Sequence, residues 1–178
     1  ESIEIVREVT EGGTVHYEGE IFEVGPYSMA LDSEGVPIYN GAMGPLNRQL
    51  TAEFCDGWIP GLVSIDHLAQ LHEEMIETAE KADREPPTVA PWVPTAVDED
   101  PEHAMRRVQQ LIAREMAMGY NEGMEQYGFR DEADLAFERF RAGDRTGAAD
   151  AIPQEMVEIL GVYGTPEDVR MQYERYFD

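Results

Sequence analysis

The residues with the clearest chemical potential form one short stretch, Asn40-Gly41-Ala42-Met43-Gly44-Pro45. Glycines allow a backbone to turn tightly and to approach a ligand, and the start of a helix offers unpaired N–H groups to an anion. The stretch therefore fits a turn that binds a phosphate group. Glycines before a helix also occur in tight turns that bind nothing, so the local pattern leaves both interpretations open.

Other groups that could do chemistry are scattered. The four histidines show no metal-ligand spacing, and His67 and His72, which are five residues apart, point in different directions on a helix. Neither a P-loop nor a GxSxG motif is present. Cys55 fits a small buried helix residue better than a nucleophile. The sequence therefore assigns no metal site and no catalytic residue.

Four polar or aromatic residues stand near the ends of predicted strands: Asn40, Trp58, Trp92 and Thr95. At that position side chains either line a pocket or fill the layers of a barrel. We keep both interpretations for these four.

The elements around the glycine turn follow a strand, turn, helix and strand order. Residues 36–39 predict a short buried strand. Pro45 suits a first helical position, and Leu46, Leu50 and Phe54 repeat behind it at helical spacing, which predicts an inward face. Trp58-Ile59 predicts a second strand, too short to stand alone outside a parallel sheet.

The remaining segments predict further helices and strands. Residues 1–9 fit a helix with Ile3 and Val6 on one face, and residues 15–24 fit two short strands or an extended arm that Gly25-Pro26 closes. A polar connection follows at residues 32–34. Ser64 is a candidate N-cap for a helix that runs to about Arg84.

The last ninety residues alternate in the same way. Residues 88–97 predict one irregular strand, since Pro91 and Pro94 cannot donate ladder hydrogen bonds. A helix begins at Asp100-Pro101, and residues 119–151 predict short helical pieces, an insertion anchored over the main body by Phe137 and Phe140. Two final helices follow, the second capped at Thr165.

Alternating helices and strands predict an α/β fold with parallel strands. Three parallel strands alone would leave both sheet edges open. We therefore expect residues 1–178 to form one domain, part of a larger (β/α) barrel whose sites lie at the carboxyl ends of the strands. Residues 40–44 fall at such an end.

The composition is strongly acidic. There are 37 acidic and 13 basic residues, for a formal net charge of -24, and Lys81 is the only lysine. Such a charge repels phosphate backbones and anionic lipids, so we expect neither nucleic-acid nor membrane binding. Dispersed acid keeps proteins hydrated in concentrated salt, which favours a salt-adapted protein over an ordinary acidic one. Stability that does not change at low salt would contradict this interpretation.

The single cysteine excludes an intrachain disulfide and favours a cytoplasmic location. No apolar run approaches the ~18 residues that a membrane span requires. The chain has no initiator Met and begins inside a predicted helix, so we expect it to be a piece of a longer protein.

The stretch VPIYNGAMGPLNRQLTAEFCDGW (residues 36–58) resembles the late strand–turn–helix of luciferase-like flavin and deazaflavin oxidoreductases, most closely the 5,10-methylenetetrahydromethanopterin reductases. HYEGEIFEV is similar to the family's extended arm, TVAPWVPTAVDEDPEHA to its last barrel strand and following helix, and GVYGTPEDV to a helix start near its C-terminus. The likeness extends over nearly the whole chain but matches only the second half of the family.

This resemblance implies the C-terminal portion of a TIM (β/α)8 barrel that binds coenzyme F420. The implied reaction moves a hydride between F420 and a one-carbon group on a pterin-type carrier. The backbone of residues 40–44 and the helix start at Pro45 would hold the cofactor's phosphate. Family members often carry glutamine where Met43 stands. The resemblance, with the acidic composition, indicates a haloarchaeal enzyme.

Two other functions stay open. One keeps the fold and replaces F420 by FMN, as in luciferase-like monooxygenases. The other is a non-catalytic half-barrel that pairs with another subunit. In each case we expect a homo-oligomer, or association with the missing half of the barrel, and we expect the isolated chain to be inactive.

Overall fold

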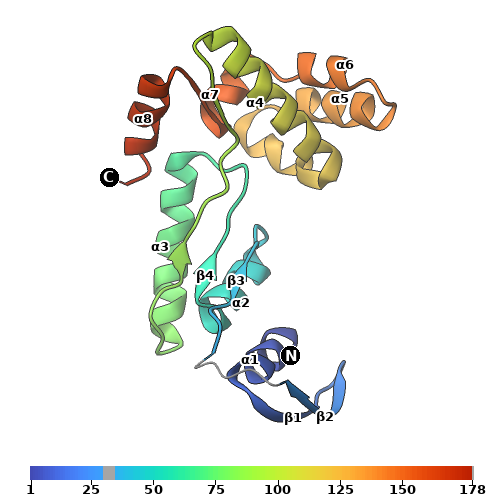
Figure 1. Cartoon of the computed structure of the whole chain (residues 1–178), viewed down its shortest axis with the longest axis vertical. Coiled ribbons are helices and arrows are strands. Elements are labelled where there is room, and N and C mark those ends of the chain that lie inside the picture. The colour runs from blue at the N-terminus through green and yellow to red at the C-terminus, as the bar shows by residue number, and fades with distance from the viewer. Residues whose placement is uncertain (30–34, 178) are drawn as a thin grey trace. The chain divides into compact units, whose positions relative to one another are not determined.

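The computed structural model describes residues 1–29 and 35–177 (Figure 1). The chain divides into two compact units: Glu1–Gly61 with Ala69–Pro91, and Leu62–Leu68 with Trp92–Asp178. Helix α3 (Ile65–Lys81) contributes to both. The connection predicted at residues 32–34 lies outside the described residues.

The first unit contains a three-stranded parallel sheet in the order β3-β4-β5. Helix α2 connects β3 to β4, and α3 connects β4 to β5, which confirms the predicted alternation (Figure 1). The bounds are β3 (Tyr39–Asn40), α2 (Pro45–Phe54), β4 (Gly57–Trp58) and β5 (Thr88–Val89).

The strand predicted at residues 36–39 is shorter and less buried than expected. It starts only at Tyr39, and the exposed fractions of Val36 and Tyr39 are 49% and 42%. The Tyr39 ring lies against Gly57, its partner on β4, where any side chain would collide with it. An apolar run shows that a segment can be buried, but not which of its faces another element covers.

Helix α2 begins at Pro45 as predicted, but its buried face is different. Leu46 is 68% exposed and Phe54 is also at the surface, whereas Thr51 and Ala52 are buried. The Thr51 hydroxyl donates to the Asn47 carbonyl (2.7 Å) and accepts from the Asn40 side-chain amide (2.9 Å). Because both of its bonds are made inside the protein, a polar residue can occupy the inward position.

The N-terminal segment forms helix α1 (Ser2–Glu11) and an antiparallel pair, β1 (Gly13–Glu18) and β2 (Glu23–Met29). The helix is confirmed, and Val6, on its predicted apolar face, is exposed. The predicted stop at Gly25-Pro26 is wrong, since β2 continues through it. Pairing is irregular between Val15 and Tyr17, opposite these two residues, so the missing N–H of proline removes no regular ladder bond.

The second unit is mainly helical and has one two-stranded parallel sheet of β6 and β7. Its core is formed by helices from residue 101 onward and includes Val108, Ile112, Met116 and several alanines. The elements are β6 (Thr95–Val97), α4 (Pro101–Glu115), the π-helix η1 (Met116–Tyr120), the 3-10 helix η2 (Glu122–Tyr127), α5 (Arg130–Arg141), α6 (Arg145–Asp150), α7 (Gln154–Leu160), β7 (Val162–Gly164) and α8 (Pro166–Glu174).

The helix caps predicted in this unit are confirmed, and two predictions about longer segments are wrong. Asp100 caps α4, and Thr165 forms a capping box at α8. The single strand predicted over residues 88–97 is wrong: its prolines divide it into β5 and β6, which belong to different sheets. Phe137 and Phe140 pack against the core of this unit, so the broken helices of 119–151 are part of that core and not a cover over it.

The fold is therefore mixed α/β, with open sheets in the described ranges. Within those ranges no helix is long and apolar enough to cross a membrane.

Candidate functional site

The structure places residues 40–45 in the predicted position. Asn40 ends β3 and Pro45 begins α2, so the turn between them lies at the carboxyl end of a parallel strand, beside the central strand β4 (Figure 1). In parallel α/β sheets, ligand sites form at this edge.

Asn40 holds the base of the turn. Its side-chain amide donates to Thr51 on α2 (2.9 Å), and its carbonyl accepts from the N–H of Ile59 (3.0 Å). Both bonds stay within the protein. Asn40 therefore orients the turn, and one N–H of its side-chain amide is used in doing so.

Ala42 is fixed by a buried tryptophan that the sequence placed only near a strand end. The Ala42 side chain is buried, and its carbonyl accepts a 2.6 Å hydrogen bond from Nε1 of the fully buried Trp58. A buried indole N–H requires such a partner. In a trans peptide the C=O and the following N–H point in opposite directions, so the Met43 N–H points away from Trp58.

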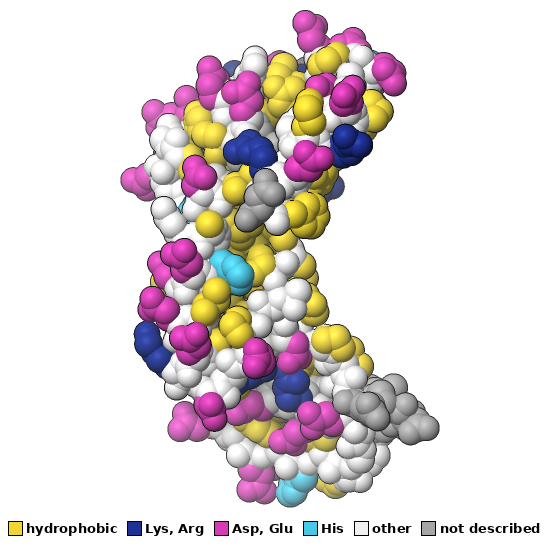
Figure 2. All heavy atoms as spheres, turned by 90° about the vertical axis from the view of Figure 1, so that its left-hand side faces the viewer, with side chains coloured by type: hydrophobic (Ala, Val, Ile, Leu, Met, Phe, Trp, Pro, Cys, Tyr) yellow, Lys and Arg dark blue, Asp and Glu magenta, His cyan; other side chains and the backbone are white. Residues whose placement is uncertain are grey.

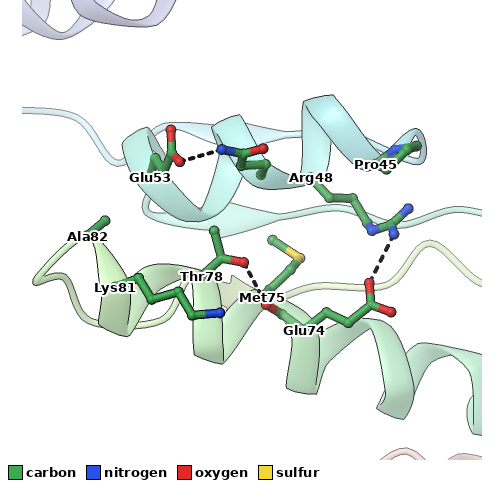
Figure 3. A pocket seen from close by; sticks show the side chains of 9 residues that line it. Pro45, Arg48, Glu53, Glu74, Met75, Thr78, Lys81 and Ala82 are labelled. Carbon is green, nitrogen blue, oxygen red and sulfur yellow. Dashed lines mark hydrogen bonds and ion pairs between the residues drawn. The ribbon is translucent and has the colours of Figure 1, made fainter.

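Met43 is fixed in the same way by Arg48. Nη1 of Arg48 donates to the Met43 carbonyl (2.5 Å), while Nη2 pairs with Glu74 on α3 (3.1 Å; Figure 3). The Gly44 N–H consequently points away from Arg48. Two carbonyls of the turn are thus turned toward donors of this chain. No sequence motif indicated either contact.

The two glycines leave open space in front of the turn. Neither has a left-handed backbone, and Gly44 has φ -71° and ψ 150°, which any residue can adopt. A Cβ at Gly44 would meet no atom within 4 Å, and one at Gly41 would meet only the Ile59 carbonyl, at 3.8 Å. Neither backbone strain nor packing in this chain requires glycine here. A side chain would occupy the space through which a ligand approaches the backbone.

The start of α2 is unusual within this chain. Its N-cap, Gly44, offers no side-chain oxygen, and its first turn contains no acidic residue. Every other α-helix in the described ranges has an acidic residue in the first turn, a side-chain cap, or both. The N–H groups of Leu46 and Asn47 lie in a first turn without intrahelical partners, so they are available to an anion.

The amino end of the same sheet is organised around Asp56, which sequence analysis did not single out. Its carboxylate accepts from the Ile38 N–H (2.8 Å) and from Nη2 of Arg7 (3.0 Å), and it pairs with Arg84 (3.5 Å). Partial burial opposes ionisation, but the Ile38 N–H and the two guanidinium groups outweigh it and hold the pKa of Asp56 below its usual value.

Cys55, next to this cluster, is buried as predicted. Burial, and then the charge of Asp56, raise the pKa of its thiol. Because a thiolate is the reactive form, the structure supports a packing role over a nucleophilic one.

A cavity of about 500 Å³ lies between α2 and α3 (Figure 3). Its two basic residues have carboxylate partners: Arg48 pairs with Glu74, and Lys81 with Glu77 at 3.6 Å. The cavity adjoins the turn through Pro45 and Arg48, but its charges are already balanced. It is lined by Pro45, Arg48, Gln49, Glu53, Glu74, Met75, Thr78, Lys81 and Ala82.

The other residues considered from sequence do not join this site. Trp92 and Thr95 belong to the second unit, where the Thr95 hydroxyl is hydrogen-bonded to Tyr173 (2.6 Å). His67 Nδ1 is hydrogen-bonded to the Tyr127 hydroxyl (3.0 Å). Among residues 1–29 and 35–177, no three His, Cys, Asp or Glu side chains are grouped closely enough to hold a metal ion.

Comparison with known proteins identifies relatives along the full chain. The chain is 32% identical to the 5,10-methylenetetrahydromethanopterin reductase of Archaeoglobus fulgidus, over 95% of this chain and 53% of that protein. It is 27% identical to a putative coenzyme F420-dependent oxidoreductase of Mycobacterium tuberculosis, over 97% of this chain and 57% of that one. The chain thus spans about half the length of these relatives.

Solved structures agree on the fold. The coenzyme F420-dependent tetrahydromethanopterin reductase of Methanopyrus kandleri superposes with a TM-score of 0.83 at 23% identity, covering 98% of this chain and 52% of that one. An F420-dependent secondary alcohol dehydrogenase gives 0.69 at 16% identity, covering 99% and 51%. These likenesses confirm an α/β architecture that matches about half of such a structure.

The family resemblance suggested by the sequence is also confirmed directly. The model of one family, described as luciferase-like monooxygenase, matches residues 1–178. A match over the full chain, together with the relatives above, is far more specific than the glycine turn alone. This chain belongs to the luciferase-like monooxygenase family.

Proposed function

We propose that this chain is part of a coenzyme F420-dependent oxidoreductase of the methylenetetrahydromethanopterin reductase type. In this proposal, residues 41–44 and the start of α2 hold the cofactor's phosphate group. The observation that carries it is the start of α2, which has neither an acidic residue nor a side-chain cap in a chain with 37 acidic residues. Relatives named for F420 support the choice of cofactor.

The turn would hold the phosphate mainly through its backbone. The N–H groups of Met43 and Gly44 point away from Trp58 and Arg48, and those of Leu46 and Asn47 open from the helix start. Each would donate a charge-assisted hydrogen bond to a phosphate oxygen. Because Trp58 and Arg48 hold the carbonyls of Ala42 and Met43, those oxygens cannot rotate toward the anion and repel it.

The remaining contribution of the chain is to position the cofactor. Bound F420 would supply hydride transfer to a one-carbon group on a pterin-type carrier in the cytoplasm. Such transfer depends on the alignment of two rings more than on an acid or a base. A phosphate fixed at the end of β3 sets one point of that alignment.

We also propose that the apolar strand residues of the first unit are covered by the rest of a luciferase-like barrel. Val36, Tyr39 and Ile59 lie on or beside β3 and β4, and each is at least 40% exposed. Strand residues of this kind pack inside closed barrels. Mass measurement in molar KCl tests this proposal: an assembled species is expected, and a stable, soluble monomer would count against it.

The cofactor proposal is tested by titrating the chain with F420 and with FMN and following absorbance. The variant Gly44→Val places a side chain in front of the turn without backbone strain, so we expect it to weaken F420 binding at least roughly tenfold. The matched control is Gly25→Val in β2, where a Cβ also meets nothing within 4 Å. Equal affinity of wild type and Gly44→Val would refute the phosphate site, and tighter binding of FMN would refute the choice of cofactor.

A further inference from the structure

The second unit contains a cavity of about 470 Å³ that the proposed function does not use. One wall is a stripe of α4 at helical spacing, Arg107, Gln110, Leu111 and Arg114, and the other wall comes from α5 and α6. The residues on that second wall are Phe140, Arg145 and Thr146.

The charge of this cavity is opposite to that of the protein. Three of its seven lining residues are arginines, although the whole chain has only 13 basic residues against 37 acidic ones. The formal net charge is -24, and acidic side chains are spread over the face seen in Figure 2, with few basic ones among them. A cluster of three arginines around one cavity is therefore unexpected in so acidic a protein.

Two of these arginines lack a carboxylate partner within 4 Å among the described residues. Arg107 has no ion pair, and Arg145 lies over the Phe140 ring, 5.3 Å from its centroid. Most other arginines are paired with a carboxylate: Arg7, Arg48, Arg84, Arg106, Arg130 and Arg170.

Three carboxylates on or next to α4 and α6 are engaged by other groups. Glu115 pairs with Arg114 at 2.8 Å, and Asp150 pairs with Arg106, also at 2.8 Å. Asp144, which precedes α6, caps that helix by accepting from the Gly147 N–H (2.8 Å). Since no carboxylate of the described residues lies within 4 Å of Arg107 or Arg145, both keep donors that no carboxylate of the described chain satisfies.

We propose that this cavity binds a small organic anion, one that carries a phosphate or carboxylate group on an apolar, ring-sized body. Guanidinium groups present planar, paired donors that match oxyanions. Leu111 and Phe140 would contact the apolar body, while Gln110 and Thr146 supply further polar groups for orientation. The volume is that of an ordinary small-molecule site. This site is independent of the glycine turn.

The test uses phenyl phosphate as the probe, with benzoate as a carboxylate, phenol as an uncharged ring and inorganic phosphate as an anion without a ring. Calorimetric titration of the whole chain at one fixed KCl concentration should show saturable binding of phenyl phosphate or benzoate, and at least roughly tenfold weaker binding of phenol and inorganic phosphate. The variants Arg107→Gln and Arg145→Gln should each weaken binding of the preferred probe roughly tenfold.

The matched control is Arg141→Gln. Arg141 lies over the Phe137 ring at 5.5 Å, as Arg145 lies over Phe140, but it does not line the cavity. It should leave binding unchanged. Arg107→Lys keeps the charge and loses the planar donors, so it should weaken binding less than Arg107→Gln. Without probe, Arg107→Gln should unfold at nearly the same temperature as wild type, because Arg107 has no carboxylate partner within 4 Å to lose among the described residues.

Several results would overturn the proposal. Equal weakening by all three glutamine variants would indicate general charge attraction, and no saturable binding would indicate no site. If Arg107→Gln and Arg145→Gln instead change the oligomeric mass, the partner of these arginines is an acidic side chain of a second copy.

Discussion

The two ends of the β3-β4-β5 sheet differ in whether the polar groups of the chain bind one another. At the amino end, Asp56 receives the Ile38 N–H and pairs with Arg7 and Arg84, so polar groups of the chain satisfy one another. At the carboxyl end, the carbonyls of Ala42 and Met43 are held, while the N–H groups of the turn and of the first turn of α2 face away from these contacts.

This difference indicates that one end of the sheet stabilises the fold and the other can bind a ligand. Polar groups that are all paired with one another stabilise the fold and leave no donor or acceptor for a ligand. Donors that are fixed in direction but have no internal partner can bind an anion without a change in the backbone. Within one sheet, we therefore expect variants at the amino end to change the free energy of unfolding, and variants at the carboxyl end to change cofactor affinity.

The largest effect is expected from Asp56→Ala. It leaves the Ile38 N–H and two guanidinium groups without their shared acceptor, which should cost about 3 kcal/mol of unfolding free energy by urea denaturation. Asp56→Asn keeps an acceptor for Ile38 and should cost less. F420 affinity of the folded protein should not change. A loss of affinity with unchanged stability would reverse the roles assigned to the two ends.

An intermediate effect is expected from Trp58→Phe, which affects both properties. It keeps a buried ring but removes the donor to the Ala42 carbonyl, so urea denaturation should show a loss of about 2 kcal/mol. F420 binding should also weaken, because the turn is no longer held. Trp92→Phe, the same change at a partly exposed tryptophan of the other unit, is the control and should leave F420 affinity intact. Unaltered F420 affinity in Trp58→Phe would show that the indole bond does not orient the turn.

The smallest effect is expected in the pH dependence of stability. The pKa of Asp56 is lowered in the folded protein, so its stabilising contribution is complete above the ordinary value of 3.8 and is lost as pH falls through the lower, folded value. Acid denaturation followed by circular dichroism should show a flatter profile for Asp56→Asn over this window. The pKa values of Asp134 and Asp168 are lowered as well, so the stability of both wild type and Asp56→Asn should still fall at low pH. Identical profiles would mean that the ion pairs of Asp56 contribute nothing.

Features with a local cause were predictable from the sequence. Pro45, Asp100 and Thr165 act within one turn of their own helices, and all three helix starts are found where the sequence placed them. The position of the candidate turn follows from the first of these.

Features that depend on distant partners were not predictable. The bond from Trp58 to Ala42 joins residues 16 positions apart, and the bond from Arg7 to Asp56 joins residues 49 apart. Helical spacing made Leu46 an inward residue, yet Thr51 takes that place because Asn40 satisfies its hydroxyl. Nothing in the spacing of residues 88–97 showed that β5 and β6 pair with different strands.

The most direct test of the contrast between the two ends is the change in backbone amide NMR signals when F420 is added. We predict shifts at Met43, Gly44, Leu46 and Asn47, with the amides of Ile38 and Gly57 unchanged. Shifts confined to the Asp56 end, or F420 binding without any shift at residues 41–47, would contradict the assignment of the carboxyl end as the cofactor site.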